Sequence, residues 1–188
     1  TRILSSAASD VYKRQRKAHL VDGIALTKFI HWLENEIDGT KNNHTEISLA
    51  RKLLHFRKRN KDFKGLSFGT ISSLGSNGAV IHYQPEKETD KDLSDNDIYL
   101  LDSGGQYKFG TTDVTRTILN KRDKKPKDFN EISNNYTLVL KGHIAVAASH
   151  FKKGETGKNL DSKARKFLIK NGLNYDHGTG HGVGSYLG

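Results

Sequence analysis

The stretch that decides the fold is IYLLDSGGQYKFGTTDVTRTI, residues 98–118. It begins as a short apolar run, breaks at Asp102 into Ser-Gly-Gly, and becomes β-branched again from Asp113 onward. Runs of this kind are typical of strands, and the intervening glycines allow the chain to reverse direction. We therefore predict two neighbouring strands joined as a hairpin, with Asp102 and Asp113 at the same end of the pair.

The flanking sequence extends this pattern into an α+β order. Apolar residues at helical spacing predict helices on both sides of the strands, and Thr45 is a suitable N-cap for the second helix. Asp38-Gly39 should end the first helix, and Gly172 the last. In chain order, the predicted elements are helices 17–37 and 45–59, strands 66–71, 79–83, 98–101 and 113–118 with a turn at 75–78, helices 128–150 and 160–171, and a further strand opening in 175–184.

The first fifteen residues, Thr1 to Gln15, do not continue this pattern. They are rich in Ser and Ala and resemble an artefact of sequence assembly, the alternative being a short frayed helix. We exclude this leader from the fold prediction. The remaining chain, 16–188, is predicted to contain one helix-then-strand unit and the start of a second.

Composition narrows the class of protein. The 188 residues include 31 Lys and Arg against 21 Asp and Glu, a net charge of +10, and no cysteine. The lysines are scattered and not interleaved with aromatic residues, so the charge does not indicate a nucleic-acid partner. No apolar run approaches the roughly 20 residues of a membrane helix. We expect a cytoplasmic protein in which only His, Asp and Glu can hold a metal ion.

The two aspartates are the first candidate site. Carboxylates held close together repel one another unless a cation lies between them, and oxygen donors suit Mn, Mg, Ca or Zn. Taken alone, Asp-Ser-Gly-Gly favours an ordinary turn over a metal site.

A histidine- and glycine-rich block, residues 177–184, is the second candidate. Glycines at alternate positions make a helix improbable, and an extended or looping backbone, in which the even spacing would place His177 and His181 on the same side, is expected instead. A flexible loop with incidental histidines is the alternative. A single histidine in a strand is usually structural. His82, in the predicted strand 79–83, is a candidate only because the other candidate site residues occur in the same chain.

Four blocks together resemble one family, the Xaa-Pro aminopeptidases, which are the aminopeptidase P group of the pita-bread metallopeptidases. The blocks are NGAVIHY (77–83), LLDSGGQY (100–107), GTTDVTRT (110–117) and HGTGHGVG (177–184). The resemblance extends from about residue 16 to the end of the chain. It implies an α+β pita-bread fold.

The resemblance also implies a site with two divalent metal ions, usually Mn²⁺, with Zn²⁺ or Co²⁺ as alternatives. Asp102 would chelate one ion, Asp113 would bridge both, and His181 would bind the other. His82 and His177 would be the catalytic and substrate-binding histidines, which contact the substrate without ligating metal. A metal-bridging hydroxide would attack peptides that carry proline in second position and release the N-terminal residue.

The family pattern continues to two glutamate ligands that lie beyond Gly188. We therefore expect residues 16–188 to be the N-terminal portion of the catalytic domain, truncated at its C-terminus, and this chain to be inactive although its parent is active. Long members of the family also carry two earlier domains.

Related functions remain as alternatives. Prolidase, creatinase and methionine aminopeptidase share the fold, and non-catalytic pita-bread modules bind histones, RNA or other proteins. Because Asp102, Asp113 and His181 are all present, a peptidase is favoured over a binding module. The expected partner is an Xaa-Pro peptide, with no nucleic acid and no membrane, and whether the parent is a homodimer stays open.

Overall fold

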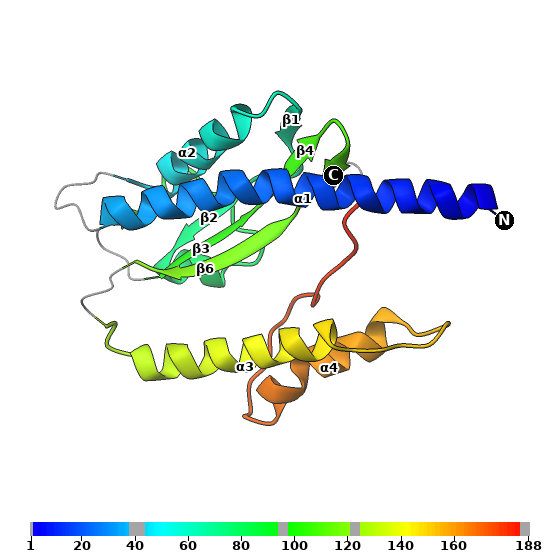
Figure 1. The fold of residues 1–188 in the computed structure, drawn as a ribbon. Helices are drawn as coiled ribbons and strands as arrows, with labels where there is room; N and C mark the ends of the chain where they lie inside the picture. The colour runs from blue at the N-terminus through cyan, green and yellow to red at the C-terminus, as the bar shows by residue number, and fades with distance from the viewer. Residues whose placement is uncertain (1, 38–43, 94–97, 121–124, 185–188) are drawn as a thin grey trace. The chain divides into compact units, whose positions relative to one another are not determined.

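A computed structural model describes residues 2–37, 44–93, 98–120 and 125–184 (Figure 1). The chain divides into two compact units. Unit 1 comprises Thr1–Lys124 with Gly182–Gly188, and unit 2 comprises Lys125–His181. Unit 1 contains helices α1 (Arg2–Ile37) and α2 (Glu46–Lys58), strands β1 (Phe63–Leu66), β2 (Ile71–Leu74), β3 (Ile98–Ser103), β4 (Gly105–Tyr107), β5 (Gly110–Thr111) and β6 (Val114–Leu119), and the 3₁₀ helix η1 (Gly75–Ala79). Unit 2 contains α3 (Phe129–Ala147) and α4 (Gly157–Ile169).

In the described part of unit 1 the strands form two three-stranded antiparallel sheets, in the orders β2-β3-β6 and β1-β4-β5. The chain leaves the first sheet at Ser103 and enters the second at Gly105, so Gly104 alone connects them. A Cβ atom at Gly104 would lie 1.9 Å from the carbonyl oxygen of Thr112, which only glycine avoids. Asp-Ser-Gly-Gly is therefore a passage between two strands, and its interpretation as an ordinary turn is wrong.

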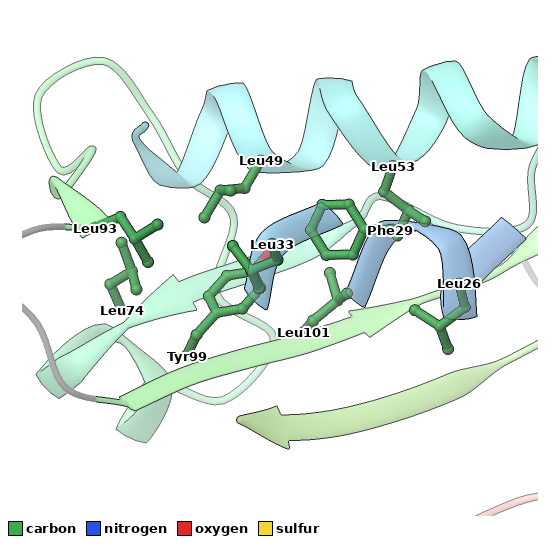
Figure 2. Close-up of a cluster of buried hydrophobic side chains, with 9 residues drawn as sticks. All are labelled: Leu26, Phe29, Leu33, Leu49, Leu53, Leu74, Leu93, Tyr99 and Leu101. Carbon is green, nitrogen blue, oxygen red and sulfur yellow. The ribbon is translucent and has the colours of Figure 1, made fainter. Parts of the chain in front are cut away.

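The apolar core of unit 1 lies between the two helices and one face of the β2-β3-β6 sheet, as Figure 2 shows. Side chains alternate along β3, so Tyr99 and Leu101 are buried against the helices while Leu100 and Asp102 belong to the opposite face. The cluster comprises Leu26, Phe29 and Leu33 of α1, Leu49 and Leu53 of α2, Leu74 of β2, Tyr99 and Leu101 of β3, and Leu93. The position of this core leaves the Asp102 face free of both helices.

A buried ion pair ties the helices to the strands. Arg57 of α2 donates from Nε and Nη2 to the two carboxylate oxygens of Asp22 of α1, over 2.8 and 2.9 Å, and both side chains are fully buried. Tyr107 Oη donates to Asp22 over 2.7 Å, and Arg57 Nη2 also reaches Ser103 Oγ at 3.1 Å. Burial, followed by the charge of Asp22, raises the pKa of Tyr107, so its hydroxyl stays a proton donor.

Helix α2 begins as expected. Thr45 Oγ1 accepts from the Ser48 amide, and Ser48 Oγ accepts from the Thr45 amide, which makes a reciprocal capping box. The predicted stop of the first helix, Asp38-Gly39, lies outside the described residues. That helix starts at Arg2 rather than near Lys17, so it runs through the predicted leader boundary.

Two strand predictions are wrong. Residues 66–71 join the end of β1 to the start of β2 rather than forming one strand. Residues 79–83 form no strand, because the predicted turn before them is the helix η1, and amide hydrogen bonds from Val80 to Asn77 and from Tyr83 to Val80 close successive tight turns. The sequence AVIHY has high β-propensity, but the local turn bonds and the contacts of its neighbours override it.

Unit 2 is built from the two helices predicted by period, α3 and α4. Gly142 of α3 lies against the backbone of Ala164 of α4, where a Cβ would meet a carbonyl oxygen at 2.2 Å, so glycine permits close helix packing. Gly172 has φ +71° and follows α4, as its predicted role at the helix end requires. None of the described helices combines the length and apolarity that a bilayer crossing needs.

Replacing Arg57 tests the buried pair. Arg57→Met should lower the free energy of unfolding by about 3–5 kcal/mol, because it leaves the Asp22 carboxylate buried without its cation. Urea unfolding followed by the fluorescence of Trp32, the single tryptophan, reports on this core. The control Arg51→Met, at an exposed position of the same helix, should change the free energy of unfolding by no more than about 0.5 kcal/mol. Equal effects of the two substitutions would contradict this account.

Candidate metal centre

The register of β3 and β6 brings Asp102 and Asp113 together. Asp102 pairs with Thr115, and Asp113 lies two residues before Thr115, directly ahead of β6. Residues two apart along a strand share a face of the sheet, so extending the alternation of β6 back by one residue puts Asp113 on the face of Asp102, as its diagonal neighbour. Such neighbours are about 7–8 Å apart at the backbone, a span that two aspartate side chains directed at one ion can close.

The environment of Asp102 fits a cation. Its Oδ1 atom is buried and has no hydrogen-bond partner among the described residues. A buried carboxylate oxygen left without a donor is costly unless a positive charge satisfies it. An oxygen donor of this kind, beside a second carboxylate on the same face, is the ligand chemistry of a divalent metal ion.

The third predicted ligand, His181, belongs to unit 2, whereas both aspartates belong to unit 1. Within the parts of the chain that the structure describes, no group of three or more His, Asp or Glu side chains is gathered to hold a metal ion. The ligand roles of Asp102, Asp113 and His181 therefore all stay predictions.

His82 lies in the turn that follows η1, and its side chain is exposed. It has φ +55°, a left-handed conformation that is uncommon for a residue other than glycine. A Cβ on Gly78 of η1 would lie 3.6 Å from Leu100 Cβ, and Leu100 is on the same face of β3 as Asp102. The segment leading to His82 thus packs on the sheet face that presents Asp102 and Asp113.

His177 lies in the loop after α4, and one side chain organises that loop. Arg165 donates to the carbonyl oxygens of Tyr175 and His177 over 2.6 and 2.7 Å, and its guanidinium lies 3.9 Å from the centre of the Tyr175 ring. Asp161 accepts two bonds of 3.0 Å from Arg165 Nε and a further bond from the Thr179 hydroxyl. We call this set of groups the loop clamp. It consists of the side chains of Asp161, Arg165, Tyr175 and Thr179 and the backbone carbonyl of His177.

The loop clamp replaces the predicted strand. The described residues of 175–184 contain no strand, so the strand predicted to open there is wrong. The backbone carbonyls of Tyr175 and His177 bond to a side chain instead of a neighbouring strand. Sequence reasoning missed Asp161 and Arg165, although their i, i+4 spacing on one face of a predicted helix was a usable signal.

Comparison with known proteins identifies the class to which this fold and site belong. The model of metallopeptidase family M24 matches residues 13–187, and the chain belongs to this family. The family resemblance inferred from the four sequence blocks is thereby confirmed.

One curated relative and two solved structures illustrate the similarity. The chain is 51% identical over 176 residues to a probable Xaa-Pro aminopeptidase P of Podospora anserina, which covers 92% of the chain and 25% of the relative. It is similar to the crystal structure of X-prolyl aminopeptidase from Caenorhabditis elegans, described as a cytosolic enzyme with a di-nuclear active site. That match has a TM-score of 0.83, 44% identity, and covers 94% of this chain and 28% of the other. A prolidase from Thermococcus sibiricus matches with a TM-score of 0.72 and 26% identity, over 94% of this chain and 44% of the other.

These matches confirm the predicted α+β pita-bread fold. The chain spans about a quarter of the length of the curated relatives that it matches, 25% and 26% in two of them.

The loop clamp depends on the charge of Asp161. Hydrogen bonds from Thr179 and then Arg165 lower the pKa of Asp161 below its ordinary value of 3.8. A carboxyl whose pKa is lower in the folded state stabilises that state above its ordinary pKa and loses this effect as pH falls through the lowered value. We expect the loop to stay ordered at neutral pH and to loosen only in acid, below about pH 3.8.

Nuclear magnetic resonance of Tyr175 and Thr179 during an acid titration measures this loosening. Asp161→Asn should abolish the acid transition and leave the loop loosened at neutral pH. Asp176→Asn, an exposed position in the same loop, is the matched control and should keep the transition. An unchanged transition in Asp161→Asn would show that another group controls the loop.

Proposed function

We propose that the protein containing this chain is a metal-dependent aminopeptidase that releases the N-terminal residue from peptides with proline in second position. The observation that carries the proposal is the Asp102–Asp113 pair on one sheet face, with the buried Asp102 Oδ1 unpartnered among the described residues. Membership of metallopeptidase family M24 supports a peptidase, and the relatives described as Xaa-Pro and X-prolyl aminopeptidases support the substrate.

The proposed cofactor is a pair of divalent metal ions. The di-nuclear active site described for the C. elegans enzyme supports this number. Asp102 and Asp113 would hold the ions through oxygen and His181 through nitrogen, a mixed set that suits Mn²⁺, our proposed native metal, with Zn²⁺ and Co²⁺ as alternatives. When bound, such ions activate water as a nucleophile at neutral pH and polarise the scissile carbonyl.

The protein's own residues would orient the substrate. His82 and His177 are proposed to contact the peptide and to stabilise charge that develops on the carbonyl oxygen. The bond before proline is a tertiary amide without an N–H, so a proline-specific site cannot rely on that donor. Both histidines lie in segments held by side-chain hydrogen bonds, which supports a role for them in orienting the peptide.

A second candidate is a prolidase-like peptidase. The T. sibiricus prolidase shares the fold over 94% of this chain, but its identity of 26% is well below the 44% of the X-prolyl aminopeptidase. The higher identity favours the aminopeptidase. A cytoplasmic location is proposed from the description of that relative as cytosolic.

The test is a peptidase assay on the longer protein that contains this chain, supplied with Mn²⁺. An Xaa-Pro peptide should be cleaved and its Xaa-Ala counterpart should not, and chelation should abolish cleavage until Mn²⁺ is restored. Asp113→Ala should lower kcat/KM by at least roughly a hundredfold, since metal stabilisation of the transition state is worth several kcal/mol. Asp128→Asn, an exposed position in unit 2, is the control and should leave the rate unchanged.

The alternatives give different results in the same assay. Equal cleavage of both peptides would favour another peptidase of the family. If the protein cleaves neither peptide and binds no metal ion, a non-catalytic binding module is favoured.

A further inference from the structure

Glu46, in the first turn of α2, collects hydrogen bonds from a long surface segment. Its side chain is fully buried. Oε1 accepts from the Leu74 amide at 2.6 Å and from Asn77 Nδ2 at 2.9 Å. Oε2 accepts from Tyr83 Oη at 2.6 Å and from the Lys91 amide at 3.3 Å. One carboxylate therefore holds the start, the middle and the end of the segment 74–91.

The chemistry of this contact requires a charged carboxylate. Among the described residues Glu46 has no salt-bridge partner, so its charge is balanced by these donors and by the positive end of the α2 dipole. Burial, followed by the hydrogen bond to Glu46, raises the pKa of Tyr83, so the phenol remains a donor. A glutamine at this position would offer one acceptor oxygen where the structure uses two.

His82 lies inside the segment that Glu46 holds. Its left-handed backbone, φ +55°, costs energy for a residue with a Cβ and persists only where the surroundings impose it. Asn77 and Tyr83 flank the turn, and each is bonded to Glu46 and to the other through Asn77 Nδ2 and Tyr83 Oη at 2.8 Å. The side chains that impose the turn thus converge on Glu46.

We propose that Glu46 is a positioning residue that fixes the turn at His82 and so the direction of the His82 imidazole. This inference rests on the proposed function, in which His82 contacts the substrate. It assigns to a buried helix residue, remote in sequence from the candidate site, control over one of that site's side chains.

The first experiment needs no activity. In the 188-residue chain, Glu46→Gln should speed amide hydrogen exchange across residues 75–91 by roughly ten- to hundredfold, as expected for loss of hydrogen bonds to a charged group. Exchange in β3 and β6 should stay unchanged. Tyr83→Phe removes a single donor and should give a smaller change in the same segment, which keeps the test valid if Glu46→Gln does not fold. Glu88→Gln, exposed in the same segment, is the control.

The second experiment is a double-mutant cycle on kcat/KM in the longer protein. Glu46→Gln should lower kcat/KM roughly as much as His82→Ala does, and should add little in the His82→Ala background, because both act through one side chain. A full further loss in that background, or unchanged exchange at residues 77–83, would overturn the proposal. If the protein does not cleave Xaa-Pro peptides, the proposed function fails, and the exchange experiment still decides whether Glu46 holds the turn.

Discussion

The antiparallel pairing of β3 with β6 is the constraint on which the candidate site depends. Asp102 pairs with Thr115, and this register places Asp113 as its diagonal neighbour on the same face. A shift of one residue would turn Asp102 toward the helices and separate the two carboxylates. The register is held from the other face, where Tyr99 and Leu101 are buried in the core. The apolar side of the strand therefore fixes the position of its charged side.

Two buried polar networks connect this sheet to the helices. The Asp22–Arg57 pair reaches Ser103, the residue next to Asp102, and Glu46 reaches the segment that carries His82. Unit 2 repeats the principle with Asp161 and Arg165, which hold the carbonyl of His177. Glu46 and Arg165 each satisfy polar groups of an irregular segment that carries a predicted site histidine, whereas Arg57 bonds to Ser103 at the end of strand β3, next to Asp102.

Local sequence was sufficient to predict an element where the hydrophobic periodicity of the segment agrees with its burial in the structure. The strands around Asp102 and Asp113, the helices α2, α3 and α4, and the Thr45 cap were predictable for this reason. Residues 79–83 were mispredicted because their β-branched side chains indicate a strand, whereas the contacts that decide their conformation come from Glu46, more than thirty positions earlier. The block 175–184 failed similarly, since its backbone is bonded by Arg165 rather than by a strand. Propensity carries no information about such distant partners.

The central claim is that Asp102 and Asp113 hold a divalent metal ion, and paramagnetic relaxation by Mn²⁺ tests it most directly. Substoichiometric Mn²⁺ added to the isotopically labelled 188-residue chain broadens amide resonances near the bound ion. The account predicts broadening centred on Asp102 and Asp113, lost in Asp102→Asn and in Asp113→Asn and retained in Asp128→Asn. Broadening that is absent from these two residues, or that survives both substitutions, would contradict it.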